Sequence, residues 1–253
     1  MPRGNRLSGD GGIFHVTHRC HNKAYLLKFA RDRDAYRDKL REHLHQFDVS
    51  ILDYCLTSNH VHLLLDAAER SELSGFMQVV AGESARAYNY RKERLNSFWG
   101  DTYHATVVEG GKYLWNCLLY VELNMVRAGV VQHPREWRWV GYQEIMGIRR
   151  RYRLLDLEVL CRRLGQTYLA EVRLNLEASL NQRRKRDDLR RQSYWSEGLA
   201  IGSASFVEKI QPSIQSRLKT EIVERSKSLW VLEEDAPAYG QKMARKTPSK
   251  AIL

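Results

Sequence analysis

The chain has 253 residues, 43% of them hydrophobic, which is enough for a packed domain with a further segment beside it and excludes a disordered protein. Its formal net charge of +11 favours a polyanionic partner, with nucleic acid ahead of an anionic membrane surface. No apolar run approaches the ~20 residues that span a bilayer, and residues 1–12 lack the apolar segment of a signal peptide, so we expect a cytosolic protein with no membrane partner.

The first half of the chain alternates between strand-like and helix-like patterns. Residues 13–19 alternate apolar and polar side chains, as a strand does, and the charged segment 31–46 has the apolar spacing of an amphipathic helix. Residues 49–56 and 60–65 are two further strands, and the polar turn between them predicts an antiparallel hairpin. A second helix is expected over residues 73–93.

A fourth strand and a third helix complete this pattern. Residues 98–110 contain aromatic side chains followed by a short β-branched run, and residues 112–131 are apolar at helical intervals up to Gly129. The element order predicts an α+β fold, in which a ferredoxin-like antiparallel sheet is covered by helices. We expect this domain to occupy residues 1–146.

The second half of the chain reads as a basic, mainly helical extension over residues 147–232, with a mobile tail over residues 233–253. A helix is predicted over residues 149–180, followed by a strongly basic run, and residues 195–210 form a small apolar island. The cysteines lack any C-x-x-C spacing, so we expect reduced, buried thiols and no thiolate zinc module. They are Cys20, Cys55, Cys117 and Cys161.

The stretch "TSNHVHLLLD" (57–66) places two histidines one residue apart in a predicted strand. Alternate side chains of a strand share a face, so His60 and His62 would lie roughly 6.5–7 Å apart on one side of the sheet. Two nitrogen ligands in that position are half of a metal site. Taken alone, such a pair is more often structural than metal-binding.

Tyr120 and Asn124 lie four residues apart in the third predicted helix and therefore share one helix face. An amide oxygen can complete a two-histidine site for a divalent cation, and a tyrosine hydroxyl one turn away would lie beside that cation. Singly, Tyr120 is more often a packed aromatic and Asn124 a helix-surface amide.

These four side chains together would support phosphoryl transfer. A phenol has a pKa near 10 and is a poor nucleophile at neutral pH without help. Mg²⁺ or Mn²⁺ held by His60, His62 and Asn124 would polarise a phosphate oxygen, while Tyr120 attacks the phosphorus. The product would be a phosphotyrosyl bond to one DNA end, and the reverse attack by a DNA hydroxyl would rejoin strands.

Several motifs of this chain resemble those of the REP-associated tyrosine transposases, single-tyrosine HUH transposases related to those of small insertion sequences. "NHVHLLL" (59–65) resembles the His-hydrophobe-His signature, and "YVELNMVRAGVV" (120–131) resembles the Tyr-x-x-x-Asn helix with its following segment. One departure is Met125, where the family usually has proline, which questions local helix geometry. Further similar segments are "FHVTHRCHNK" (14–23), "FWGDTYHATVVE" (98–109), "EWRWVGYQE" (136–144) and "AIGSASFVEKI" (200–210).

The resemblance implies that Tyr120 is the nucleophile and that His60, His62 and Asn124 hold the metal. It also implies a ferredoxin-like core with the histidines on a central strand. The substrate would be single-stranded DNA whose palindromic repeats fold into hairpins, cut beside the hairpin in the bacterial cytoplasm, at the nucleoid. The repeat-associated branch suggests a monomer, whereas dimers occur among insertion-sequence relatives.

DNA contacts are expected from three groups of side chains, because hairpin stems present phosphates to arginine and lysine. For any one of these residues a solvated surface role is equally plausible. The groups are Arg19, Asn22 and Lys23 after the first strand; Arg127, Arg149, Arg150 and Arg151; and Arg183, Arg184, Lys185 and Arg186. Trp137 and Trp139 are expected to pack in the core, and a second metal site at His15 and His18 is unfavoured because the two face opposite sides of a strand.

Three functions are compatible with these motifs. The first is a DNA endonuclease and strand transferase acting beside hairpins. The second is a replication initiator or relaxase, which the lack of a helicase-like domain disfavours. The third is a catalytically silent hairpin-binding regulator, which would have no chemical need for Tyr120, His60, His62 and Asn124.

Overall fold

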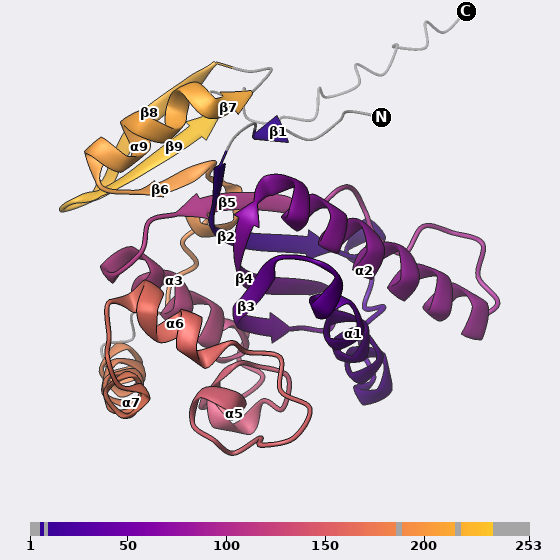
Figure 1. Cartoon of the computed structure of the whole chain (residues 1–253). Helices are drawn as coiled ribbons and strands as arrows, with labels where there is room; N and C mark the ends of the chain where they lie inside the picture. Colours follow the sequence, from indigo (N-terminus) through magenta and orange to yellow (C-terminus); the bar gives the residue numbers. More distant parts are fainter. Residues whose placement is uncertain (1–5, 8–9, 186–188, 216–218, 235–253) are drawn as a thin grey trace, which may run out of the picture.

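A seven-stranded sheet with the order β3-β4-β2-β5-β6-β9-β8 forms the centre of the computed structural model (Figure 1). The structure describes residues 6–7, 10–185, 189–215 and 219–234. The sheet strands are β2 (Asp10–Arg19), β3 (Val49–Leu56), β4 (His60–Glu69), β5 (His104–Val108), β6 (Ala200–Gly202), β8 (Thr220–Ser226) and β9 (Leu229–Glu234), and β1 (Arg6–Leu7) pairs with β7 (Ile214–Gln215) in a separate two-stranded sheet.

Helices lie on both faces of the large sheet, with α1 and α2 on one face and α3 and α6 on the other (Figure 1). The α-helices are α1 (Ala30–His43), α2 (Arg70–Arg91), α3 (Lys112–Glu122), α4 (Asn124–Arg127), α5 (Tyr142–Ile145), α6 (Leu157–Leu164), α7 (Leu169–Lys185), α8 (Tyr194–Glu197) and α9 (Ala204–Ile210). Single 3₁₀ turns are η1 (His21–Lys23), η2 (Leu44–Gln46), η3 (Pro134–Glu136) and η4 (Gln211–Ser213).

The predicted ferredoxin-like core is confirmed. β2, β3, β4 and β5 are antiparallel neighbours in the order β3-β4-β2-β5, and α1 and α2 pack together on one face. The predicted hairpin joins β3 to β4, and its turn is closed by a hydrogen bond from Thr57 N to His60 O at 3.0 Å. β4, a central strand of this core, is buried along most of its length, so the sheet fixes the backbone that carries His60 and His62.

The extension contributes strands that the sequence analysis did not predict. β6 pairs in parallel with β5, and β9 and β8 continue the sheet beyond it. The sheet therefore runs across the boundary predicted near residue 146, although the division into 1–146, 147–232 and 233–253 otherwise stays a prediction. Residues 233 and 234 belong to β9, and the rest of the predicted tail lies outside the described residues.

The single helix predicted over residues 149–180 is wrong. Helix α6 begins only at Leu157, where the Asp156 carboxylate accepts a hydrogen bond from Val159 N at 3.0 Å and caps the helix. α6 ends at Leu164, and the next residue, Gly165, has a φ of +70°, the left-handed conformation that glycine adopts easily. The apolar periodicity was real, but it belongs to two helices separated by a turn.

The predicted third helix is also divided. α3 ends at Glu122, Leu123 lies between, and α4 begins at Asn124 and ends before Gly129, which has a φ of +68°. A helical hydrogen bond from Arg127 N to Leu123 O, at 2.9 Å, continues the helical path of the backbone through this junction. Tyr120 and Asn124 therefore remain on one side, as their spacing predicted.

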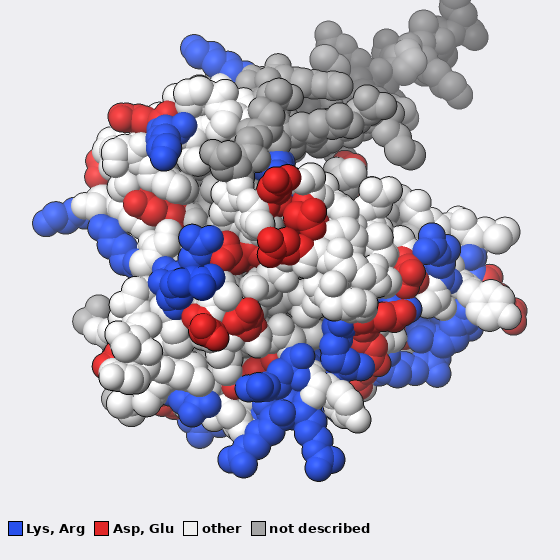
Figure 2. Space-filling model, in the orientation of Figure 1, with Lys and Arg blue, Asp and Glu red and all other residues white. Residues whose placement is uncertain are grey.

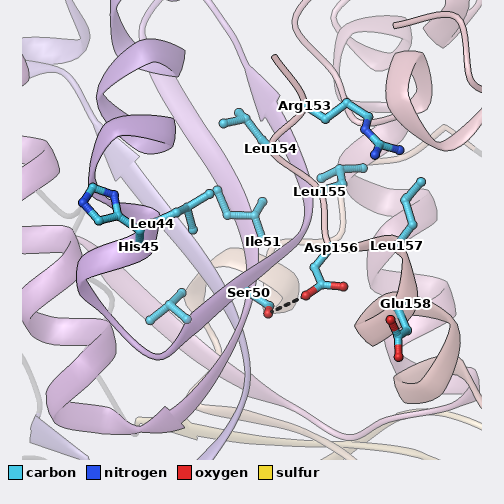
Figure 3. Close-up of a pocket in the computed structure, with 11 residues that line it drawn as sticks. Leu44, His45, Ser50, Ile51, Arg153, Leu154, Leu155, Asp156, Leu157 and Glu158 are labelled. Carbon is cyan, nitrogen blue, oxygen red and sulfur yellow. Dashed lines mark hydrogen bonds between the residues drawn. The ribbon is translucent and has the colours of Figure 1, made fainter. Parts of the chain in front are cut away.

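The outer edge of β3 is covered by the start of the extension. Asp156 N donates to Ile51 O at 2.9 Å, and Ser50 Oγ donates to the Asp156 carboxylate at 3.1 Å. Residues of both segments line an open groove of about 570 Å³ beside this contact. Figure 3 shows Arg153 and Glu158 on the extension side of this groove. The contact occupies an edge strand that would otherwise expose backbone hydrogen-bonding groups.

Two buried carboxyl groups face each other beneath this sheet. Asp53 on β3 and Glu122 on α3 are 0% and 1% exposed. Gly141 allows them to fit, because a Cβ atom there would lie 1.9 Å from Asp53 Oδ1 and 3.4 Å from Glu122 Oε1. Burial raises the pKa of both carboxyls well above the ordinary range, and the negative charge of Asp53 raises the pKa of Glu122 further.

This pair predicts a stability that falls as pH rises. The folded state holds a proton that the unfolded chain releases near pH 4, so the stabilising contribution is complete at acid pH and is lost as pH rises through the raised pKa. We expect the free energy of unfolding of Asp53→Asn to fall less over this pH range than that of the wild type. The difference should be about 1.4 kcal/mol for each unit by which folding raises the pKa of the removed carboxyl. Urea denaturation from pH 5 to 9 measures it, with the exposed Asp48→Asn as control; parallel curves for wild type and Asp53→Asn would contradict it.

Candidate metal and nucleophile site

The four residues predicted to form a site are brought together on the α3 side of the sheet. His60 and His62 project from one face of β4, and their ring centroids are 4.8 Å apart. The Tyr120 ring, from α3, has its centroid 6.0 Å from that of His62. Asn124 Nδ2, at the start of α4, lies 2.9 Å from His62 Nε2.

His60 is held through one ring nitrogen. Its Nδ1 donates to Asn59 Oδ1 at 2.7 Å and lies 2.9 Å from Thr57 Oγ1, both in the hairpin turn. This assignment leaves a lone pair on Nε2. Burial, followed by the nearby charge of Arg19, lowers the His60 pKa to about 3, so the imidazole is neutral and able to act as a ligand at neutral pH.

His62 is the central member of the group. Its Nδ1 lies 2.9 Å from Nε2 of His15, a residue of β2, and its Nε2 faces the Asn124 amide. Burial, followed by the proximity of His60 and His15, lowers the His62 pKa well below its ordinary value. This ring is therefore also neutral at physiological pH.

The donor set fits a divalent cation. Two neutral imidazoles present nitrogen lone pairs, and the Asn124 amide presents its oxygen after a half-turn that exchanges Oδ1 and Nδ2. Nitrogen and oxygen ligands of this kind suit Mn²⁺, and Mg²⁺ where water and phosphate complete the shell. His60, His62 and Asn124 are the residues that would hold the ion.

Tyr120 is surrounded by side chains that fix its ring. The Arg127 guanidinium lies 4.1 Å from the ring centroid and donates from Nη2 to Tyr120 O at 2.7 Å. The Trp195 ring lies at 6.2 Å on another side. A cation over an aromatic face is attractive, so Arg127, predicted as a DNA contact, is placed beside the phenol itself.

His15 and Trp195 also contact this site, although the sequence motifs did not indicate them. His15 contacts His62, and Trp195 O lies 2.6 Å from His15 Nδ1. His18 projects to the face of the sheet opposite His15, as predicted from their spacing, and its ring stacks on that of Trp99 with centroids 3.9 Å apart. His104 hydrogen-bonds Gly198 O at 2.8 Å.

The group after the first strand lies at the rim of the site. Arg19 is exposed and is the register partner of His60. Asn22 and Lys23 are exposed in η1 with φ of 51° and 58°, and Lys23 O accepts a hydrogen bond from Asn59 Nδ2 at 3.1 Å. The hairpin turn that positions His60 is thus tied to this basic loop.

Apart from Arg127, which lies beside Tyr120, the second basic group is placed away from the site. Arg149 is half-buried and donates to Arg138 O at 3.0 Å, while Arg150 and Arg151 are exposed. Their loop lies beside α1, where the Arg41 guanidinium is 4.9 Å from the Tyr152 ring. On the face in Figure 2, basic side chains gather between α5 and α1.

The third group lies partly near Tyr120. Arg183 donates to Asn116 Oδ1 of α3 at 2.7 Å, and its charge contributes to the lowered pKa of Arg127, after burial, which is the main cause. Arg184 contacts Asn181 Oδ1 at 3.4 Å on its own helix. Lys185 ends α7, with a side chain that is not described, and Arg186 lies outside the described residues.

The two tryptophans predicted to pack in the core do so around a cation. Trp139 is buried, Trp137 is half-buried, and the Arg33 guanidinium lies 3.9 and 4.8 Å from their respective ring centroids. Their faces are therefore occupied within the protein.

Glu42, His43 and Glu83 form a second group with metal-compatible spacing, between α1 and α2. Lys39 Nζ already lies 2.8 Å from Glu42 and 2.9 Å from Glu83, and His43 bonds Glu83 at 3.0 Å. The ammonium group is shared by the two carboxylates and offsets one of their two charges, so this cluster is an ion-pair network between two helices.

None of the helices in the described part of the chain has the length and hydropathy to cross a bilayer.

Residues 11–124 match the family described as IS200-like transposases. A structure of a REP-associated tyrosine transposase bound to a REP hairpin is 15% identical, with a TM-score of 0.49, over 58% of this chain and 86% of that one. A candidate transposase from Deinococcus radiodurans is 19% identical, with a TM-score of 0.34, over 52% and 94%. A search of the curated proteins finds no match. The matched range contains His60, His62, Tyr120 and Asn124, and over residues 11–124 the chain is similar to the IS200-like transposases.

Proposed function

We propose that this protein is a transposase: a metal-dependent endonuclease and strand transferase for single-stranded DNA, cutting beside palindromic hairpins with Tyr120 as the nucleophile. The observation that supports it is the convergence of Tyr120 with His62 and Asn124, two side chains of the predicted metal site. The hairpin substrate, the REP-associated branch and the monomeric state rest on the sequence motifs. The place of action is the bacterial cytoplasm, at the nucleoid.

The proposed step is an in-line displacement at phosphorus. The Tyr120 oxygen forms a bond to phosphorus and loses its proton to water, the bond from phosphorus to the DNA 3′-oxygen breaks, and that oxygen takes up a proton. The downstream strand then carries a 5′-phosphotyrosyl link. Attack by another DNA 3′-hydroxyl reverses the step and joins strands, because the phosphodiester energy is retained.

A bound divalent cation, Mg²⁺ or Mn²⁺, would supply positive charge at a non-bridging phosphate oxygen. His60, His62 and Asn124 would hold that ion, and Arg127 would keep the Tyr120 ring oriented through its contact with the ring face and the Tyr120 carbonyl. Arg19, Asn22 and Lys23 at the rim, with Arg183 near Arg127, are proposed to contact the DNA backbone.

The alternative of a silent hairpin-binding regulator predicts binding without cleavage. The discriminating experiment uses a pool of single-stranded oligonucleotides, each with one stem-loop flanked by randomised segments and a 3′-label. With Mg²⁺ or Mn²⁺, we expect a labelled protein adduct that survives denaturing electrophoresis. The adduct should not form when EDTA is present from the start of the reaction. Hairpin binding without any adduct in either metal would overturn the endonuclease proposal and favour the regulator.

A further inference from the structure

A chain of hydrogen bonds leads from the metal-site face of His62 to the backbone of the extension. Asn124 Nδ2 lies 2.9 Å from His62 Nε2, His62 Nδ1 lies 2.9 Å from His15 Nε2, and His15 Nδ1 lies 2.6 Å from Trp195 O. The two imidazole planes are nearly parallel, with centroids 5.1 Å apart and an interplanar angle of 13°. His15 and its partners in this chain are buried or half-buried.

The backbone carbonyl of Trp195, at the end of this series of hydrogen bonds, fixes the position of each ring proton in the series. A backbone carbonyl can only accept, so His15 must carry its proton on Nδ1 and donate it to Trp195 O. His15 Nε2 is then an acceptor, and His62 must carry its own proton on Nδ1. His62 Nε2 is left as a lone pair directed at Asn124, which is the nitrogen available for a cation.

The carbonyl that sets this pattern is itself held firmly. Trp195 is 1% exposed, and its indole Nε1 donates to Gln192 Oε1 at 2.9 Å. Thr106 Oγ1 on β5 donates to Gly198 O at 2.7 Å, and β6 pairs with β5 immediately afterwards. The segment from Gln192 to β6 is therefore anchored to the same sheet that carries the histidines.

We propose that this segment of the extension is a working part of the metal site: Trp195 O, acting through His15, holds His62 in the Nδ1–H tautomer and presents Nε2 to the cation. His15 is a positioning residue in this scheme. The inference rests on the proposed function for the identity of the site, but Trp195 lies outside residues 11–124, which the family match covers. Outer partners of metal-binding histidines typically change metal affinity about 10- to 100-fold when they are removed.

The tautomers can be read directly in the metal-free wild-type protein. Long-range ¹H–¹⁵N spectra of protein labelled at histidine distinguish protonated from unprotonated ring nitrogens. We expect both His15 and His62 to carry the proton on Nδ1, whereas a free neutral imidazole side chain prefers Nε2. Either ring protonated on Nε2 would overturn the proposal without any variant.

The affinity arm uses Mn²⁺ alone, counted as free ion by electron paramagnetic resonance. We expect His15→Leu to weaken Mn²⁺ binding about 10- to 100-fold and to release His62 from the Nδ1–H tautomer. His15→Gln, which can accept from His62 and donate to Trp195 O, should retain most of the affinity. If His15→Leu fails to fold, the comparison of wild type with His15→Gln and the wild-type spectrum still decide the matter.

His18→Leu is the matched control. His18 is a buried imidazole on the same strand whose Nε2 donates to a backbone carbonyl, Asp101 O, at 2.9 Å, but on the opposite face of the sheet. Equal losses of Mn²⁺ affinity in His15→Leu and His18→Leu would overturn the proposal, because a general packing defect would then explain both. Neither arm contains DNA, so a failure of this inference is distinct from a failure to form the adduct.

Discussion

Tyr120→Phe is expected to abolish the covalent protein–DNA adduct while hairpin binding stays within a few-fold of wild type. The substitution removes one oxygen and leaves the ring, which is what contacts His62, Trp195 and Arg127. Loss of a nucleophile typically reduces the rate on the order of 10⁴-fold or more. Denaturing gels of labelled DNA measure the adduct, and native gels with the same DNA measure binding.

Tyr113→Phe is the matched control for this experiment. Tyr113 is a buried tyrosine of the same helix, and its hydroxyl donates to Ser228 O at 2.6 Å, away from the histidines. Loss of this hydroxyl should lower the free energy of unfolding by about 1 kcal/mol and leave the adduct yield unchanged. An adduct formed by Tyr120→Phe at the wild-type rate would show that another group attacks the phosphate.

The core of the fold could be predicted because its signals are local. The hairpin of β3 and β4 follows from two apolar runs around a polar turn, and Gly129 ends a helix for a reason visible in one residue. The strands of the extension carry no such signal. β6 has three residues and gains its place only by pairing with β5, about ninety positions earlier in the chain.

The site divides in the same way. Tyr120 with Asn124, and His60 with His62, are brought together by helix and strand periods that the spacing alone contains. The role of His15 depends instead on the register of β2 against β4, in which Thr17 pairs with His62 and His15 with Leu64. Trp195 contributes a backbone carbonyl, so its side-chain type carries no sign of that contact.

Glu144 joins the ferredoxin-like core to the beginning of the extension through a fully buried network. Its Oε1 accepts hydrogen bonds from Arg37 at 3.1 Å and from the Tyr54 hydroxyl at 2.9 Å. Its Oε2 accepts from the backbone nitrogens of Leu154 at 2.7 Å and Leu155 at 2.9 Å. The side chains of Arg37 and Glu144 are 7% and 0% exposed, so water cannot replace a missing partner.

We expect Glu144→Ala to lower the free energy of unfolding by about 3–5 kcal/mol, because it leaves the Arg37 guanidinium buried without a counter-charge and two backbone N–H groups without an acceptor. Urea denaturation measures this loss. Asp38→Ala, which removes an exposed partner of Arg41 at 3.1 Å, should cost about 0–1 kcal/mol.

A double substitution separates the charge from the packing. Arg37→Met with Glu144→Leu removes both charges and keeps side-chain volume, so it should be less destabilising than Glu144→Ala alone, although the backbone nitrogens of Leu154 and Leu155 remain unpaired. If the double variant is as unstable as Glu144→Ala, the unpaired backbone groups dominate. Loss of under 1 kcal/mol in Glu144→Ala would instead show that water reaches Arg37, contrary to its burial.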